Sequence, residues 1–225
     1  VFSFYTLISR VLGYIRDILI AVFLGASVLA DAFFVAFRIP NTFRRLFAEG
    51  TFNAAFIPSY TSEKLKSTSN GKKFADDVIS LLLIILLAII FIVEIFTPYL
   101  VYLIAPGFYD NSEKFGLAVD LTRITFPFLL FVSLSSFFSG VLNSNNKFAA
   151  ASAAPIILNI ILILTLLIAY LLKLNFALSL SYGVTLSGII QLIFLIIFSR
   201  KYYKPSIVFK SKINSKVKFF LKKLL

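Results

Sequence analysis

Long apolar runs alternate with short polar stretches along this chain of 225 residues. Most of these runs approach or exceed the roughly 20 residues that a helix needs to cross the hydrocarbon core of a bilayer. They recur along the whole chain, which excludes a single cleaved signal peptide as their explanation. The pattern therefore predicts an all-α, polytopic membrane protein with six membrane-spanning helices, at residues 7–24, 30–56, 78–104, 117–142, 152–172 and 176–199.

The polar stretches between the runs predict turns and loops. The sequence Gly25-Ala26-Ser27 predicts a short turn, and the Ser-, Lys- and Asn-rich residues 59–77 predict a loop. Proline lacks a backbone N–H and clashes with the preceding turn of a helix, so a proline within an apolar run predicts a kink. We expect such kinks at Pro40, Pro98, Pro127 and Pro155.

Charged residues lie within the first two predicted spans, where a membrane helix normally has none. Burying an ion at bilayer depth costs at least about 2.5–3.5 kcal/mol on insertion scales, so such residues normally face a protein interior or a water-filled cavity. Several of them recur at helical spacing in the second span, near one stripe of the helix. The charged residues are Arg10, Arg16, Asp17, Asp31, Arg38, Arg44, Arg45 and Glu49.

This set contains five arginines and three acidic residues, so the predicted site is cationic. A guanidinium group presents a planar fork of donors that matches phosphate oxygens, which favours a phosphate or diphosphate ligand. The alternative is that the arginines and aspartates only form ion pairs that tie the two helices together. Arg45, near the end of the second span, is interpreted as an interfacial anchor. In the fifth span, Asn159 predicts an interhelical hydrogen bond.

The formal net charge of +12 is concentrated at the C-terminal end. From Arg200 onward the chain carries nine Lys or Arg residues and no acidic residue. Next to membrane spans, such a segment favours anionic membrane lipids over nucleic acid as its partner. The sequence thus predicts two parts: six transmembrane helices within 1–199, and a basic amphipathic segment at 200–225.

Basic residues also set the expected orientation. The loops after the second, fourth and sixth spans are richer in Lys and Arg than the loops after the first, third and fifth. By the positive-inside rule the first group is cytoplasmic, which places the N-terminus in the cytoplasm as well.

The composition argues against an enzyme. With no Cys and no His, the chain has neither a thiolate or imidazole metal site nor a nucleophile–histidine pair. It contains no Gly-rich nucleotide-binding loop and no paired carboxylates with room for a substrate. We therefore expect a transport protein without a cofactor or a metal.

Several motifs resemble the MurJ (MviN) family of bacterial lipid II flippases, within the MOP exporter superfamily. The resemblance covers the whole chain and is most specific in its first sixty residues. The matching segments are Ser9–Asp17, Asp31–Asn41, Arg44–Gly50, Ala55–Pro58, Ala105–Phe108, Phe126-Pro127, Leu142–Ser144 and Lys147-Phe148.

The resemblance implies a two-lobed, fourteen-helix protein that exposes a cationic cavity alternately to each side of the bacterial inner membrane. By the same resemblance, residues 1–199 are one six-helix transmembrane lobe, and 200–225 are a basic amphipathic link towards a truncated second lobe. The implied activity is translocation of lipid II, the undecaprenyl-diphosphate-linked peptidoglycan precursor, from the inner to the outer leaflet for cell wall synthesis. Arg10, Arg16 and Arg44 match the family's substrate-binding arginines, and Asp17 and Asp31 match its gating acids. Arg38, Arg45 and Glu49 are secondary candidates that rest on the charge pattern of the second span and not on the family match.

Two other functions stay open at this point. A related exporter would share the helices and the orientation but would move another lipid-linked sugar or a small amphiphile. A non-transporting membrane assembly factor would use the same charges only for helix pairing or partner docking. A channel is disfavoured, because the spans are kinked and rich in Phe, and no repeated pore ring is present.

Overall fold

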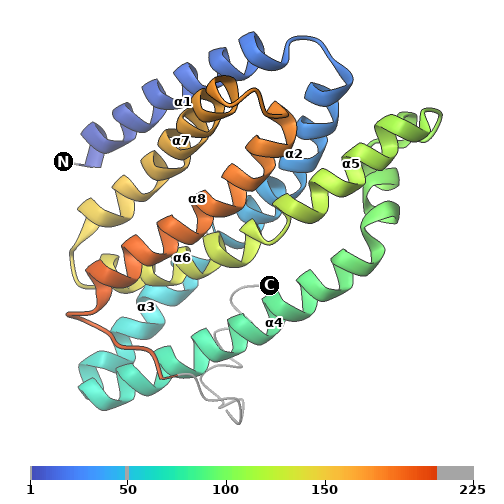
Figure 1. The fold of residues 1–225 in the computed structure, drawn as a ribbon. Coiled ribbons are helices and arrows are strands. Elements are labelled where there is room, and N and C mark those ends of the chain that lie inside the picture. The colour runs from blue at the N-terminus through green and yellow to red at the C-terminus, as the bar shows by residue number, and fades with distance from the viewer. Residues whose placement is uncertain (1, 49–50, 207–225) are drawn as a thin grey trace.

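The structure, a computed structural model, describes residues 2–48 and 51–206, and of residues 2, 43–48 and 51 it describes the backbone alone. The described residues form helices joined by short turns (Figure 1). In chain order these are α1 (Phe2–Leu24), α2 (Val28–Ala48), α3 (Thr51–Lys66), α4 (Thr68–Ile104), the 3-10 helix η1 (Pro106–Phe108), α5 (Ser112–Thr125), α6 (Phe128–Asn143), α7 (Phe148–Leu171) and α8 (Phe176–Ser199). The all-α prediction is confirmed.

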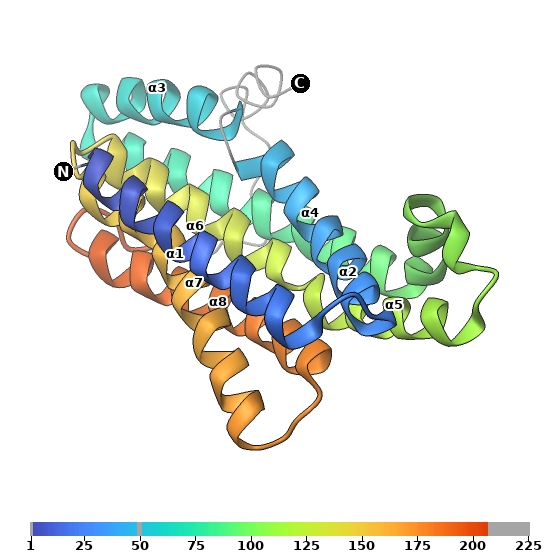
Figure 2. The same cartoon turned by 90° about the horizontal axis from the view of Figure 1, so that it is seen from above.

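Helix α6 lies in the middle of the bundle and packs against α2, α3, α4, α7 and α8. It can do so because aromatic and aliphatic side chains cover it on several sides, and Phe128, Phe137 and Phe138 are almost completely buried. Helix α1 lies at one edge, where it packs mainly along α7 (Figures 1 and 2).

Four helical stretches of the described residues are long and apolar enough to cross a membrane: α4, α5 with α6, α7 and α8. They coincide with the third to sixth predicted spans. The first predicted span corresponds to α1. The second, predicted at 30–56, corresponds to α2 only as far as Ala48, and its last residues, 51–56, belong to α3 instead. Helices α1 and α2 do not meet the criterion because they carry the charged residues described above. The count of six spanning helices therefore stays a prediction.

The predicted interruptions at two prolines are confirmed. In α4, Phe96 leaves helical geometry (φ −99°, ψ 16°) two residues before Pro98. Phe126 and Pro127 form a turn that separates α5 from α6. Helices α2 and α7, by contrast, continue through Pro40 and Pro155.

The loop predicted at residues 59–77 is wrong, because this stretch is almost entirely helical. Helix α3 continues to Lys66, and α4 begins at Thr68 after the single cap residue Ser67, whose hydroxyl accepts a hydrogen bond of 3.0 Å from the Asn70 N–H. The two helices form a tight hairpin, and a Cβ atom placed on Gly71 would lie 2.9 Å from the Lys64 Cα atom. The polar composition thus marks a solvated helical hairpin, which composition alone does not distinguish from a loop.

The close approach at Gly71 gives a prediction for stability. Alanine is a better helix former than glycine by about 1 kcal/mol, but at Gly71 its methyl group would collide with backbone and force α3 and α4 apart. We expect Gly71→Ala to lower the free energy of unfolding by about 1–3 kcal/mol, measured by thermal unfolding of the full-length protein in detergent. The matched control is Gly116→Ala in α5, where a Cβ meets open space and stability should be unchanged or higher.

The polar ends of the bundle differ in charge. The α3–α4 turn, the α6–α7 turn and the end of α8 lie at the same end of the molecule as the N-terminus (Figures 1 and 2). The α1–α2 turn and the segment between α4 and α5 lie at the opposite end. Basic residues that the sequence places in separate loops are therefore gathered at one end of the bundle: Lys64, Lys66, Lys72, Lys73, Lys147, Arg200, Lys201 and Lys204.

Candidate functional site

Helices α1 and α2 diverge from the turn at Gly25, which has a positive φ of 58° that favours glycine. Helix α1 packs mainly on α7, whereas α2 packs on α5, α6 and α8. Each helix consequently turns one face away from the core. On α1 this exposed face includes Arg10, Val11, Tyr14, Asp17 and Ile18.

Arg16 lies at the boundary between this exposed face and the α1–α7 contact. Its Nε and Nη2 atoms donate to Asp17 Oδ1 at 2.9 and 2.7 Å, and its Nη1 atom donates to Asn159 Oδ1 on α7 at 2.8 Å. The Arg16 side chain is 17% exposed and that of Asp17 64%. One guanidinium group therefore joins an exposed carboxylate to a buried amide on the neighbouring helix.

Asn159 also fixes α1 at a second point. Its Nδ2 atom donates to the Ser9 carbonyl oxygen at 2.9 Å, and the amide lies beside Gly13 of α1. Because one end of the amide accepts from Arg16 while the other donates to Ser9, its orientation is defined by both contacts. The interhelical hydrogen bond predicted for Asn159 is confirmed.

On α2, Asp31 and Arg38 lie on one exposed stripe of the helix, as their spacing predicts. Asp31 forms an ion pair of 2.5 Å with Lys114 at the start of α5, and the Lys114 ammonium also lies 4.2 Å from the centre of the Phe108 ring. In this structure the partner of Asp31 is thus a lysine from a later segment. Sequence reasoning did not identify Lys114 as the partner of Asp31. The only feature of the sequence that points to it is that Lys114 is the single basic residue in the otherwise acidic segment 110–114.

The other predicted site residues are less constrained. Arg10 and Arg38 are exposed, and neither side chain makes an ion pair or a hydrogen bond with a residue in the described part of the chain. Arg44 and Arg45 lie in α2, where the structure describes their backbone alone, and Glu49 lies outside the described residues. Of the predicted site residues with described side chains, Arg16 and Asp17 alone are brought into direct contact.

A second polar cluster, missed by sequence reasoning, lies at the basic end of the bundle. Asp76, buried near the start of α4, accepts hydrogen bonds from the Tyr203 hydroxyl at 2.6 Å and the Ser206 N–H at 2.9 Å. We call these three residues the Asp76 latch. Burial and the Asp76 carboxylate raise the pKa of the Tyr203 phenol above its ordinary value, so the hydroxyl stays protonated and donates. The latch holds the segment after α8 against α4.

Apolar helices that turn a charged face away from their own core define a multi-pass membrane protein with a polar site at its surface. The family model described as "Lipid II flippase MurJ" matches residues 20–225. The chain therefore belongs to the MurJ family of bacterial membrane proteins.

Individual relatives agree with this assignment. The chain is 41% identical over 202 residues to the probable lipid II flippase MurJ of Rickettsia prowazekii (strain Madrid E), covering 89% of this chain and 39% of that protein. It is 44% identical over 192 residues to the probable lipid II flippase MurJ of Rhizobium tropici, covering 83% of this chain and 36% of that protein. The chain thus spans well under half the length of these relatives.

A solved structure of lipid II flippase MurJ in an inward closed conformation is also similar. It matches with a TM-score of 0.82 and 30% sequence identity, over 99% of this chain and 46% of that chain. The helices described above therefore have the arrangement of one part of a MurJ protein.

Proposed function

We propose that this chain is the first lobe of a lipid II flippase, which carries the undecaprenyl-diphosphate-linked peptidoglycan precursor from the inner to the outer leaflet by alternating access. The observation that carries the proposal is the exposed charged face of α1, bordered by Arg16 and its contacts, in a chain that belongs to the MurJ family. The lobe comprises residues 1–199, and the basic segment 200–225 links it to the second lobe. Most of that segment, 207–225, lies outside the described residues.

In this proposal the arginines bind the diphosphate of the substrate. Arg10 is exposed on α1 and has no described partner, so its full set of donors is available to phosphate oxygens. Arg16 is held in place by Asn159, and its contacts with Asp17 are the ones that an incoming diphosphate would replace. Arg44 would contribute from α2.

The acidic residues serve as the gate. When the cavity is empty, Asp17 neutralises Arg16, which lowers the cost of holding an arginine near bilayer depth. Substrate phosphate competes with Asp17 for the same donors, so binding releases the carboxylate. The ion pair between Asp31 on α2 and Lys114 on α5 is a second charge contact of this lobe, and the proposal assigns Asp31 to the gate with it.

The exposed faces of α1 and α2 would be covered by a second lobe. The chain covers 39% of the Rickettsia relative and 46% of the solved structure, which leaves room in those proteins for a further helical unit. Alternating access requires two units that move against each other around a shared site. The proposal therefore assigns to this chain half of the binding surface.

The proposed location is the bacterial inner membrane, with the N-terminus in the cytoplasm. Support comes from the gathering of Lys and Arg residues at the end of the bundle that carries the N-terminus. The positive-inside rule places such an end on the cytoplasmic side.

Binding of the purified lipid-linked precursor to the full-length protein in detergent tests the proposal. We expect Arg10→Ala, Arg16→Ala and Arg44→Ala each to weaken binding by about tenfold or more, because each removes charge-assisted hydrogen bonds to phosphate. Lys72→Ala, an exposed lysine of the α3–α4 hairpin, is the control and should bind as the unmodified protein does.

Equal binding by all four variants would contradict the assignment of these arginines to the diphosphate. Absence of binding by the unmodified protein, with binding of a different lipid-linked sugar, would favour a related exporter instead. If the arginine variants are less stable but the folded fraction binds the precursor as the unmodified protein does, the arginines pair helices and the assembly-factor function is favoured.

A further inference from the structure

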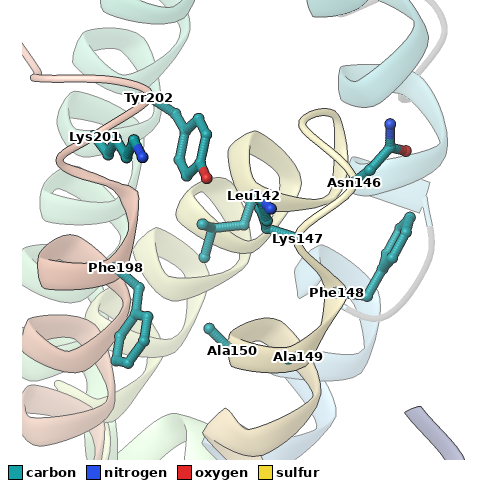
Figure 3. Close-up of a pocket in the computed structure, with 9 residues that line it drawn as sticks. All are labelled: Leu142, Asn146, Lys147, Phe148, Ala149, Ala150, Phe198, Lys201 and Tyr202. Carbon is teal, nitrogen blue, oxygen red and sulfur yellow. The ribbon is translucent and has the colours of Figure 1, made fainter. Parts of the chain in front are cut away.

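A pocket of about 660 Å³ lies at the basic end of the bundle, between the α6–α7 turn and the end of α8 (Figure 3). Leu142, Ala150 and Phe198 form much of its wall. Its polar groups come from Asn146, Lys147, Lys201 and Tyr202. The site proposed for the diphosphate uses none of these residues. We call this cavity the headgroup pocket.

The two lysines of the headgroup pocket have no acidic partner among the residues that the structure describes. Both are exposed at the pocket, and neither side chain forms a described hydrogen bond or ion pair. Two unpaired ammonium groups beside one cavity repel each other, and an anion bound between them would relieve that repulsion.

The backbone at both lysines is fixed, so the pocket is preformed. The Lys147 N–H donates to the Leu142 carbonyl at 3.0 Å, which closes the α6–α7 turn. On the other side, the N–H groups of Tyr202 and Tyr203 donate to the Ser199 carbonyl at 2.8 and 2.9 Å. The Asp76 latch then holds Tyr203 against α4. Preformed cavities of roughly 300–1,000 Å³ are the usual size for small-ligand sites.

The position of the pocket identifies the class of ligand. It lies where two apolar helices, α7 and α8, reach the end of their membrane-spanning length. Phe198 is exposed, as are Ile193 and Ile197 on the same helix, so an apolar surface leads from the pocket along α8. A ligand that fills the site therefore combines a negative charge at the interface with a hydrocarbon chain towards the bilayer centre. Basic pockets between membrane helices are known to take anionic lipid headgroups.

We propose that the headgroup pocket binds an anionic membrane phospholipid, with Lys147 and Lys201 on its phosphate and an acyl chain along Phe198. Tyr202, with an apolar ring and a polar hydroxyl, belongs at the same depth. The pocket would thereby couple the α6–α7 turn and the end of α8 to the anionic leaflet. It lies outside the surface that the substrate is proposed to use.

Titration of the delipidated full-length protein with fluorescent phosphatidylglycerol tests this inference, with fluorescent phosphatidylcholine as the uncharged comparison. We expect the double variant Lys147→Gln/Lys201→Gln to bind phosphatidylglycerol about tenfold to thirtyfold more weakly, and phosphatidylcholine as before. The matched control, Lys72→Gln/Lys73→Gln, removes the same charge from exposed positions at the same end of the bundle and should have little effect. Ala149→Phe, which fills the pocket without a change in charge, should also weaken binding of phosphatidylglycerol.

Three results would overturn the proposal. The first is an equal loss of affinity in both lysine pairs, which would indicate attraction by diffuse surface charge. The second is unchanged binding in the Lys147/Lys201 pair. The third is one-to-one displacement of phosphatidylglycerol by the lipid-linked precursor, which would assign the pocket to the transported lipid. Precursor binding itself is measured separately, so failure here leaves the flippase proposal intact.

Discussion

Replacing Arg16 with lysine in the full-length protein is expected to reduce transport of the lipid-linked precursor by at least tenfold, although the positive charge is kept. The Arg16 guanidinium makes three hydrogen bonds in two directions, two to Asp17 and one to Asn159. A lysine ammonium is a single point on a flexible stem and cannot reproduce this fork. Each hydrogen bond to a charged group contributes about 1.5–3 kcal/mol, so the loss of one already accounts for a tenfold effect.

The measurement is translocation of a labelled precursor by protein reconstituted in vesicles. Arg123→Lys is the matched control, because Arg123 is an exposed arginine of α5 with no hydrogen-bond partner in the described part of the chain. A second measurement, thermal unfolding, separates a binding role from a structural one. Full transport by the Arg16→Lys variant would show that the position needs only a positive charge. Precursor binding that is unchanged, together with a lower unfolding temperature, would show that Arg16 serves only to pair α1 with α7.

Replacing Asp76 with alanine is expected to lower the free energy of unfolding by about 2–4 kcal/mol, the largest stability effect that we predict. The substitution leaves the buried Tyr203 hydroxyl and the Ser206 N–H without their shared acceptor. An unsatisfied buried donor costs about 1–3 kcal/mol. Asp76→Asn keeps an acceptor oxygen in the same place and should cost much less.

Thermal unfolding of the full-length protein in detergent measures this effect, with Asp120→Ala at an exposed position of α5 as the control. A double-mutant cycle with Tyr203→Phe isolates the contact between the two side chains. If the effects of Asp76→Ala and Tyr203→Phe simply add, the contact between these two side chains does not contribute to stability. A loss of stability in Asp76→Ala no larger than that in Asp120→Ala would contradict the prediction.

The spans of the apolar core follow from local pattern. Helices α7 and α8 begin and end within a few residues of the predicted spans. The reason is that an unbroken Leu- and Ile-rich run of about 20 residues crosses a bilayer as a single helix. The turn at Gly25 and the break at Pro127 also follow from single residues with restricted backbone preferences.

The partners of the charged residues do not follow from local pattern. Asn159 reaches Arg16 from 143 residues away along the chain, and Lys114 reaches Asp31 from 83 residues away. The residue types predict that such contacts exist, because a charge in a span needs a partner. The identity of each partner depends on the packing of α1 on α7 and of α2 on α5. Local patterns in a single sequence do not predict which distant helices pack together.

Buried acidic residues outside the apolar runs were equally hard to predict. Asp76 stands beside Lys72 and Lys73 in a polar stretch, where a solvated surface residue is the simplest interpretation. Its burial depends on Tyr203, which lies beyond the last predicted span. The error about residues 59–77 has the same origin, because polar composition is compatible with both a loop and a helical hairpin in water.

The length of α4 places the cations of the basic end at two depths. Its apolar run begins at Val78, so the ten residues from Thr68 to Asp77 carry the helix about 15 Å further. The headgroup layer is roughly 5–8 Å thick on each side of the hydrocarbon core. If α4 runs along the membrane normal, the α3–α4 turn would stand in water beyond the lipid phosphates, whereas the α6–α7 turn follows directly on apolar helix ends. The lysines of the hairpin would then face the aqueous compartment, and Lys147 and Lys201 would lie level with the lipid surface, as the headgroup pocket requires.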